Sequence, residues 1–211
     1  MRTDIDPDEM GHGGFYKVLT SVVVPRPIAW VSTRSGAGVD NLAPHSFFTV
    51  SCVAPPMVQF TSVGKKDSLR NVLETEEFVV CLATESMLDR VNATGTNFPA
   101  DLSEFTEVGL TPEPSMTVKP SRVAESPVAL ECRLERVLEL GDSTVVIGRV
   151  QHAAVDTDVM ETDRRGSSLP AIERLRPLAR LGRNEWSTIG EVLDVARIPY
   201  EKWPGDFGRH S

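Results

Sequence analysis

A short stretch of the sequence, Gly64–Asn71, combines residue types that bind anions. Two lysines, Lys65 and Lys66, follow a glycine, and Asp67 and Ser68 then precede apolar residues at helical spacing. Asp and Ser are common N-cap residues, so we expect a helix to begin here with one of them as its cap. The first N–H groups of a helix lack intrahelical partners and its dipole is positive at that end, which suits a phosphate group. An ordinary strand-to-helix connection with two solvated lysines is the alternative interpretation.

Other chemistries find little support in the sequence. Asp67 separates Lys66 from Ser68, which excludes the Gly-Lys-Ser/Thr ending of a nucleoside triphosphatase loop. The chain has no GxSxG or HExxH motif, and its histidines lie far apart in sequence. The three cysteines are widely spaced without a CxxC pair, so we expect neither a disulfide framework nor a metal site, and we expect Cys81 and Cys132 to be small core residues. A phosphate site with few acid–base candidates suits a cofactor that carries the chemistry itself.

The composition is that of an ordinary globular chain. Of 211 residues, 40% are hydrophobic and 25% are charged, and the formal net charge is −8. An acidic balance argues against a general nucleic-acid binder, whose affinity rests on basic surface. No apolar run approaches the roughly 20 residues that cross a bilayer, and the N-terminus is acidic with no apolar signal region. We therefore expect a cytoplasmic protein that binds neither nucleic acid nor membrane.

Strand patterns dominate the chain. Turn formers between residues 32 and 41 predict a hairpin, Pro55 and Pro56 end a strand, and Gly148 is a candidate bulge. Helical spacing is restricted to a few short segments: one from Ser68, one capped by Thr84 and ending at Gly95, one turn between Ser103 and Gly109, and one from Pro170 to Leu175. Residues Met160–Ser168 resemble a polar loop. The predicted strands are Val18–Val24, Pro27–Thr33, Ser46–Val50, Met57–Ser62, Phe78–Ala83, Val128–Leu134 and Thr144–Val155.

These elements predict a mainly β fold, a closed or split antiparallel barrel with short inserted helices. Closure removes the exposed edges that a chain with so many strands would otherwise carry. No internal repeat, low-complexity segment or clean linker divides the chain.

Several sequence blocks, taken in order, resemble the flavin reductase-like, FMN-binding split β-barrel family. The resemblance covers about residues 15–195 and implies an antiparallel split β-barrel of the Greek-key type. Residues 1–14 would then be an N-terminal lead-in and residues 196–211 a C-terminal tail. The blocks are PRPIAWVST (25–33), NLAPHSFF (41–48), APPMVQFTS (54–62), KKDSLRN (65–71), ATGTNFP (93–99), VGLTP (108–112), ALECRL (129–134) and LARLGRNEW (178–186).

The resemblance also implies a cofactor and a site. FMN would lie in a groove at a homodimer interface, and FAD is less expected because the sequence has no second dinucleotide fingerprint. Carried over position by position, the FMN-binding residues would be Lys66, Asp67, Ser68 and Asn71 at the phosphate with Ser62 adding a hydroxyl, Asn41, Leu42, Ala43, Pro44, His45, Ser46 and Phe47 along the ring, and Ser32 and Thr33 beside the ribityl chain.

The implied activity is hydride transfer from NAD(P)H to the flavin, at its N5 atom, and on to a small-molecule or protein acceptor. No catalytic side chain is expected, since orientation and water exclusion would supply most of the rate. Arg180, Arg183 and Trp186 are candidate substrate-binding residues, although the arginines could equally be solvated surface groups. His45 and Trp186 depart from the family pattern, which affects substrate preference more than flavin binding. An FMN-binding electron carrier or storage protein, or a barrel that binds another phosphorylated ligand, are the alternatives.

Overall fold

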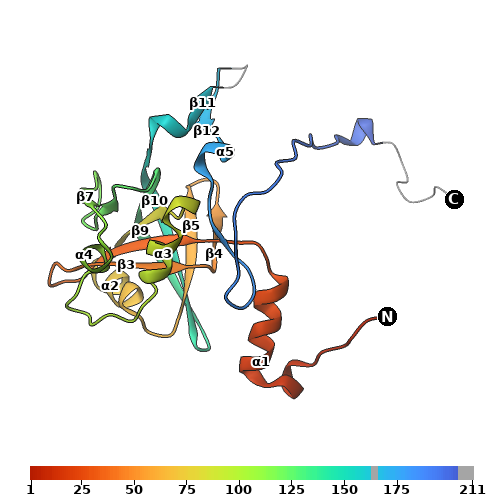
Figure 1. The fold of residues 1–211 in the computed structure, drawn as a ribbon, viewed down its shortest axis with the longest axis horizontal. Coiled ribbons are helices and arrows are strands. Elements are labelled where there is room, and N and C mark those ends of the chain that lie inside the picture. The colour runs from red at the N-terminus through yellow and green to blue at the C-terminus, as the bar shows by residue number, and fades with distance from the viewer. Residues whose placement is uncertain (163–165, 204–211) are drawn as a thin grey trace.

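A seven-stranded antiparallel sheet forms the body of the protein (Figure 1). The computed structural model describes residues 1–162 and 166–203, apart from the side chain of His12. The strand order is β3-β2-β6-β9-β10-β5-β4. The strands span Ala29–Arg34 (β2), Asp40–His45 (β3), Phe48–Cys52 (β4), Met57–Val63 (β5), Glu77–Leu82 (β6), Val128–Leu140 (β9) and Ser143–Val155 (β10).

The sheet curves until its two edges meet. Its edge strands, β3 and β4, are consecutive in the chain and are joined by Ser46 and Phe47 alone. At the closure β3 lies beside β5, and the Nδ1 atom of His45 on β3 is 3.4 Å from the Thr61 carbonyl oxygen on β5. The predicted mainly β fold and its split barrel are therefore confirmed, and we call the junction between β3 and β5 the barrel seam.

Two groups of buried side chains fill the structure. One lies between β2, β5, β6, β9 and β10 and includes Phe60, Phe78 and Val146, together with Val72 of the first barrel helix. The other packs the opposite side of the sheet around Trp30, which is fully buried. The predicted bulge at Gly148 is confirmed by a shift in the β9–β10 register there. A Cβ atom at this position would lie 2.2 Å from the Phe78 ring, so only glycine fits.

Short helices and strands complete the barrel. The helices are α2 (Asp67–Thr75), α3 (Leu88–Ala93), α4 (Glu104–Val108) and α5 (Ile172–Leu175), and single 3₁₀ turns span Glu85–Met87, Thr157–Val159 and Tyr200–Lys202. The short strands are Arg26–Pro27 (β1), Pro112–Glu113 (β7), Arg122–Val123 (β8), Met160–Thr162 (β11), Ser168–Pro170 (β12), Ala179–Arg180 (β13) and Trp186–Ser187 (β14). The helix predicted from Thr84 exists, but it ends at Ala93 rather than Gly95. The turn predicted between Ser103 and Gly109 is confirmed, with Gly109 in the left-handed conformation.

The N-terminal region is a helix, where we expected a loose lead-in and a strand. Helix α1 spans Pro7–Val22 with a kink at Gly11. The Asp6 side chain caps it by accepting from the amide of Asp8 at 2.8 Å, and proline occupies the first turn. The prediction of a strand over Val18–Val24 is wrong because these capping signals, together with the positions before Val18, extend the helix through most of the β-branched run.

The predicted polar loop at Met160–Ser168 is also wrong in part. Its described ends form a hairpin in which Met160 pairs with Pro170 and Thr162 with Ser168. Residues 163–165 of that prediction lie outside the described residues. Backbone pairing of a short polar ribbon leaves little apolar periodicity, so the sequence pattern could not indicate it.

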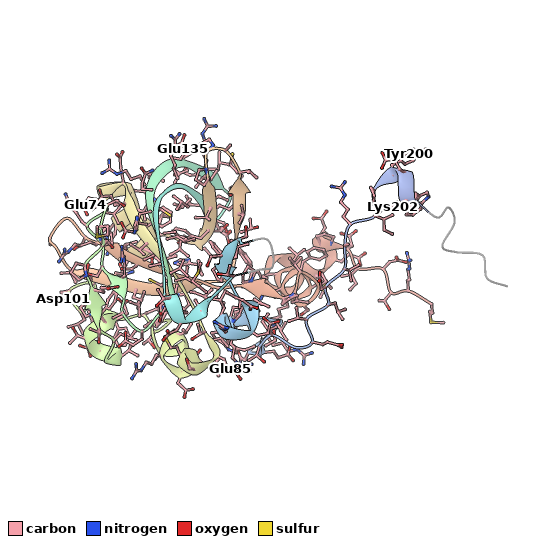
Figure 2. The ribbon with its side chains drawn as sticks, turned by 90° about the horizontal axis from the view of Figure 1, so that it is seen from above. Glu74, Glu85, Asp101, Glu135, Tyr200 and Lys202 are labelled. Atoms are coloured by element: carbon pink, nitrogen blue, oxygen red, sulfur yellow. The ribbon has the colours of Figure 1, made fainter. Side chains whose placement is uncertain are left out.

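The chain beyond β14 forms an extended C-terminal arm, residues 188–203, most of it without regular structure. The arm leaves the barrel on the same side as α1 in both views (Figures 1 and 2), and Tyr200 and Lys202 lie near its far end. Every described residue of the arm is exposed. The predicted C-terminal tail, residues 196–211, has no regular structure before the single turn at Tyr200–Lys202. Residues 204–211 of that tail lie outside the described residues.

Candidate functional site

A cavity of about 400 Å³ opens along the barrel seam, within the usual size range of small-molecule sites. Strand β3 and the turn that follows it form one wall, and β5 with the turn into α2 forms another. Helix α1 and the segment between α3 and α4 close the remaining sides. The lining residues are Tyr16, Asn41, Ala43, Pro44, His45, Ser46, Phe47, Thr61, Val63, Lys65, Lys66, Asp67, Ser68, Thr94, Gly95, Thr96, Asn97, Phe98 and Glu104.

The start of α2 lies in this wall and no side chain caps it. Lys66, rather than the expected Asp67 or Ser68, is the N-cap residue, and it makes no side-chain capping hydrogen bond. The first amide to bond into the helix is that of Arg70, which donates to the carbonyl of Lys66 at 3.0 Å. The amides of Asp67, Ser68 and Leu69 are therefore left as donors beside two lysines. This is the arrangement that binds a phosphate group.

The side chains of the expected caps are engaged elsewhere. Asp67 forms an ion pair with Arg70 one turn along the helix. Ser68 is buried, and its hydroxyl accepts from the Asn41 amide group at 3.2 Å. The negative charge of Asp67 is thus partly neutralised, and the local balance at the helix start is positive.

Two hydrogen bonds of Gly64 fix the turn before α2. Gly64 has a φ of 75°, a conformation that favours glycine. Its carbonyl accepts from the Ser62 hydroxyl and its amide donates to the Asp142 carbonyl, both at 2.9 Å. Ser62 is fully buried, so it positions the lysine turn instead of lining the cavity.

His45 forms part of the β3 wall as an uncharged group. It is 8% exposed, its ring lies 4.7 Å from that of Phe60, and its Nδ1 atom is 3.4 Å from the Thr61 carbonyl oxygen. Burial lowers the pKa of His45 to about 4; the contact with Thr61 opposes this change and the charge of Lys66 favours it. The imidazole is therefore neutral at pH 7.

Glu104 brings a buried carboxylate to the opposite side of the cavity. It extends from α4 and accepts a 2.9 Å hydrogen bond from the Leu42 amide on the edge strand β3. Burial raises the pKa of Glu104, and the hydrogen bond from Leu42 opposes that change. This bond holds the α3–α4 segment against β3, because an edge strand otherwise leaves such an amide unpaired.

Nine of the predicted FMN-binding residues line the cavity, and five do not. The nine are Asn41, Ala43, Pro44, His45, Ser46, Phe47, Lys66, Asp67 and Ser68. Ser32, Thr33, Leu42, Ser62 and Asn71 are buried behind the wall. Among them, the Asn71 amide group donates to the Thr33 hydroxyl at 3.1 Å, which ties α2 to β2.

The predicted substrate-binding residues lie outside the cavity lining. The Arg180 guanidinium stacks on Trp186 at 4.6 Å and donates to the Arg183 carbonyl at 3.0 Å. Trp186 also packs against the core around Trp30. The three residues thus stabilise the β13–β14 hairpin in this structure.

Sequence reasoning missed residues that other elements bring to the cavity. Tyr16 comes from the unexpected helix α1, and its ring lies 6.4 Å from that of Phe47. Lys65 lines the cavity together with Lys66, although only Lys66 was among the FMN-binding residues that the resemblance implied. The Thr94–Phe98 stretch belongs to a block, ATGTNFP, that carried the family resemblance, so its position in the chain was the available signal.

Comparison with known proteins identifies the family. A protein-family model described as the flavin reductase like domain matches residues 21–172, most of the chain. The chain belongs to the flavin reductase-like family. The uncharacterized protein BH2278 of Halalkalibacterium halodurans is 37% identical over 205 residues, which cover 92% of this chain and 95% of that protein.

Solved structures agree with the family assignment. Nitrilotriacetate monooxygenase component B from Bacillus cereus is 32% identical with a TM-score of 0.86, and the match covers 92% of this chain and 99% of that one. A Shewanella frigidimarina protein described as a flavin reductase with a split barrel domain shares the fold at 19% identity and a TM-score of 0.80, covering 94% and 100% of the two chains. The family is a flavin-binding one, and the cavity fits such a cofactor through the free donors and lysines at the start of α2.

Within the described ranges, no helix is long and apolar enough to cross a membrane. The same ranges contain no group of three or more His, Cys, Asp or Glu side chains placed to hold a metal ion. The three cysteines are free, and Cys81 and Cys132 are buried core residues as expected. Burial raises the pKa of both thiols to about 12, which leaves them unreactive.

Proposed function

We propose that the chain binds FMN in the seam cavity and acts as an oxidoreductase that takes hydride from NAD(P)H and passes electrons to an acceptor. The observation that carries this proposal is the uncapped, lysine-rich start of α2 at one end of a cavity whose other walls are largely uncharged. The family assignment supplies the flavin class, and the single anion-binding end favours FMN over FAD.

The residues at the start of α2 would hold the phosphate. Lys65 and Lys66 supply charge, and the amides of the first helical turn supply directed donors. Asp67 does not cancel this charge because it is paired with Arg70. The turn is rigid, since both the carbonyl and the amide of Gly64 are bonded, so little ordering is needed on binding.

The β3 wall would face the flavin ring. Ala43, Pro44 and Ser46 present backbone and small side chains there, and neutral His45 lies behind them without adding charge. A bound flavin supplies the hydride chemistry itself. The protein's contribution is orientation of the ring and exclusion of water by Tyr16 and Phe98, so no side-chain acid or base is required.

The acceptor is proposed by analogy with relatives. The Bacillus cereus relative is one component of a monooxygenase. A component that works with another protein fits a role in which reduced flavin or its electrons leave this chain. An FMN-binding carrier without its own NAD(P)H turnover is the second candidate.

We also propose that the functional unit is a homodimer. Helix α1 exposes Leu19, Val22 and Val23, and β4 and the turn after it expose Val50 and Val53. Apolar side chains gathered on neighbouring surface elements mark an interaction face. Light scattering at micromolar concentration should give twice the 23.1 kDa chain mass, and a monomer that still binds flavin would contradict the dimer.

Two spectra test the proposed activity. The purified protein, loaded with FMN, should show a flavin absorbance that bleaches without oxygen when NADH or NADPH is added. Bleaching with NADH or NADPH supports the oxidoreductase; bound flavin that only dithionite reduces supports the carrier. No FMN binding by fluorescence titration would reject both.

A further inference from the structure

A second groove lies beside the candidate flavin cavity. Its volume is about 410 Å³, and it runs between the C-terminal half of α1 and strand β4. We call it the α1–β4 groove. Ser46, Phe47 and Thr61 line both the groove and the cavity, so the two spaces share a wall. The other lining residues are Leu19, Thr20, Val23, Pro25, Arg26, Pro27, Phe48, Thr49 and Gln59.

The groove is apolar and has a free strand edge. On the α1 side Leu19 is 48% exposed and Val23 is 58% exposed, and Phe48 lines the β4 side. Strand β4 is the last strand of the sheet, so in the described part of the chain no strand pairs with its outer backbone groups. An extended peptide can add to such an edge while its side chains fill an adjacent groove.

The C-terminal arm has the properties of such a peptide. It is extended, and the stretch from Thr188 to Ile198 contains no proline, so every backbone amide in it can donate. Among the described residues, none of these amides has a hydrogen-bond partner. Its exposed apolar side chains are Ile189, Val192, Leu193, Val195, Ile198 and Tyr200.

An isolated arm of this kind is not stable in one conformation. Ordering each residue costs about 1–2 kcal/mol, and this arm buries no side chain that could offset the cost. Apolar residues at Leu193 and Val195, two positions apart, would face the same side of an extended strand. The sequence thus provides an apolar face that the described part of its own chain does not cover.

The geometry points to the groove of a second copy. The arm and α1 leave the barrel on the same side, but the arm then runs away from α1 and β4 of its own copy (Figure 1). Fully extended, residues 189–200 reach about 40 Å, more than the roughly 30 Å diameter of a small domain. One copy can therefore reach across to another.

We propose that, in a homodimer, the C-terminal arm of each copy lies in the α1–β4 groove of the other. The exchange is reciprocal, as a two-fold interface requires. The inserted arm covers Phe47 from the groove side and so closes the wall that the groove shares with the flavin cavity. This inference rests on the homodimer of the proposed function. A different protein in the groove is the competing occupant, and the test below distinguishes it.

Photo-cross-linking of the full-length chain tests the exchange. A photoreactive p-benzoylphenylalanine replaces Val195, which is 81% exposed, and the irradiated protein is run on a denaturing gel. We expect a covalent dimer whose cross-linked peptide maps to α1 or β4. The matched control places the same group at Leu140, which is 59% exposed and is the last residue of β9. The protein labelled at Leu140 should run as a monomer on the gel.

Each other result overturns the proposal. Cross-links found only within one chain would show that the arm packs on the barrel of its own copy. Cross-links between chains that map elsewhere, or an equal yield from position 140, would remove the groove as the arm's site. If position 195 gives no cross-link to a second copy, the groove is left to a different protein and the exchange is wrong.

A charge substitution gives an independent measurement. Leu193→Glu combined with Val195→Glu should raise the dimer dissociation constant at least about tenfold, because two buried charges oppose docking. Both positions are exposed in the single copy, so the fold itself should be unaffected. If the variant dimerises like the wild type while both still bind FMN, the arm exchange fails and the proposed flavin function stands. Loss of FMN binding by the wild-type protein would reject the flavin function alone.

Discussion

The two lysines before α2 border unpaired helix donors and line the candidate flavin cavity. Substituting Lys66 by Ala should weaken FMN binding roughly ten- to a hundredfold, since a charge-assisted contact contributes about 1.5–3 kcal/mol. Riboflavin lacks the phosphate, so its affinity should barely change. Lys65→Ala should have a similar effect because Lys65 lines the same cavity. Fluorescence titration with both flavins measures these constants.

Lys119→Ala is the matched control, because Lys119 is exposed and lies outside the cavity lining. Equal losses for riboflavin and FMN would mean that the lysine substitutions damage the fold. Unchanged FMN affinity in both cavity variants would place the phosphate elsewhere.

His45 couples the site to acid stability. Its pKa of about 4 in the folded protein lies below the value near 6.5 of an unfolded chain. The unfolded state therefore binds the extra proton first, and folding stability falls as pH drops from above 6.5 to 4. The loss approaches about 3 kcal/mol, and His45→Asn should remove that part of the pH dependence. Urea unfolding between pH 7 and pH 4 measures it.

His152→Asn is the matched histidine substitution, placed on β10 and outside the lining of the seam cavity. A His45→Asn variant that loses stability over the same range as wild type would show that another group is responsible.

The sequence could reveal the site residues that lie together in continuous segments of the chain. The NLAPHS run and the lysine turn are continuous segments, and most of their predicted contacts do line the cavity. Tyr16 and Glu104 reach the same cavity from two distant helices, and no local pattern connects them. Thr33 and Asn71 use their side chains to bond to each other, and Ser32 is buried in the same wall; sequence alone does not separate such internal positions from ligand-binding ones.

At the level of elements, turn and cap residues predicted more than strand propensity did. The hairpin between β2 and β3 and the bulge at Gly148 follow from glycines and turn formers, and both are present. The β-branched residues near Val22 led to the wrong prediction of a strand. The cap at Asp6 and Pro7 starts a helix there, and this helix overrides the weak strand preference. The barrel closes where β3 meets β5. This closure depends on contacts between segments that are separated in the sequence, and no short sequence pattern encodes them.

A buried ion pair joins the seven-stranded sheet to the separate two-stranded sheet of β7 and β8. Glu131 of β9 is fully buried and pairs with Arg122 of β8, and it accepts from the amides of Met116 and Thr117 at 2.9 and 2.6 Å. Burial alone would raise the pKa of Glu131, but the hydrogen bonds from Thr117, Met116 and Arg122 lower it to about 2.

Removing one member of this pair should destabilise the protein strongly. Glu131→Ala leaves the Arg122 guanidinium buried without its carboxylate, a change that typically costs about 3–5 kcal/mol. Urea denaturation measures the loss. The double variant Glu131→Met with Arg122→Met is the control and should recover part of it, since neither charge remains. A single variant with unchanged stability would show that solvent or another group replaces the pair.

At the scale of the whole molecule, flavin binding and dimerisation should be linked. The α1–β4 groove and the flavin cavity share Ser46, Phe47 and Thr61, so whatever fills one space orders the wall of the other. Linkage requires that FMN tighten the dimer by the same factor by which dimerisation tightens FMN binding. Coupling energies of this kind are typically about 1–3 kcal/mol, or roughly five- to 150-fold.

Sedimentation with and without saturating FMN should therefore show a dimer dissociation constant at least about fivefold lower in the loaded protein. FMN titrations at protein concentrations below and above that constant should differ by the same factor. Riboflavin, which has the ring without the phosphate, serves as the control. Because the shared wall lies on the ring side, riboflavin should tighten the dimer nearly as much as FMN does. A dimer constant that FMN leaves unchanged would separate the two sites energetically, even though they share three residues.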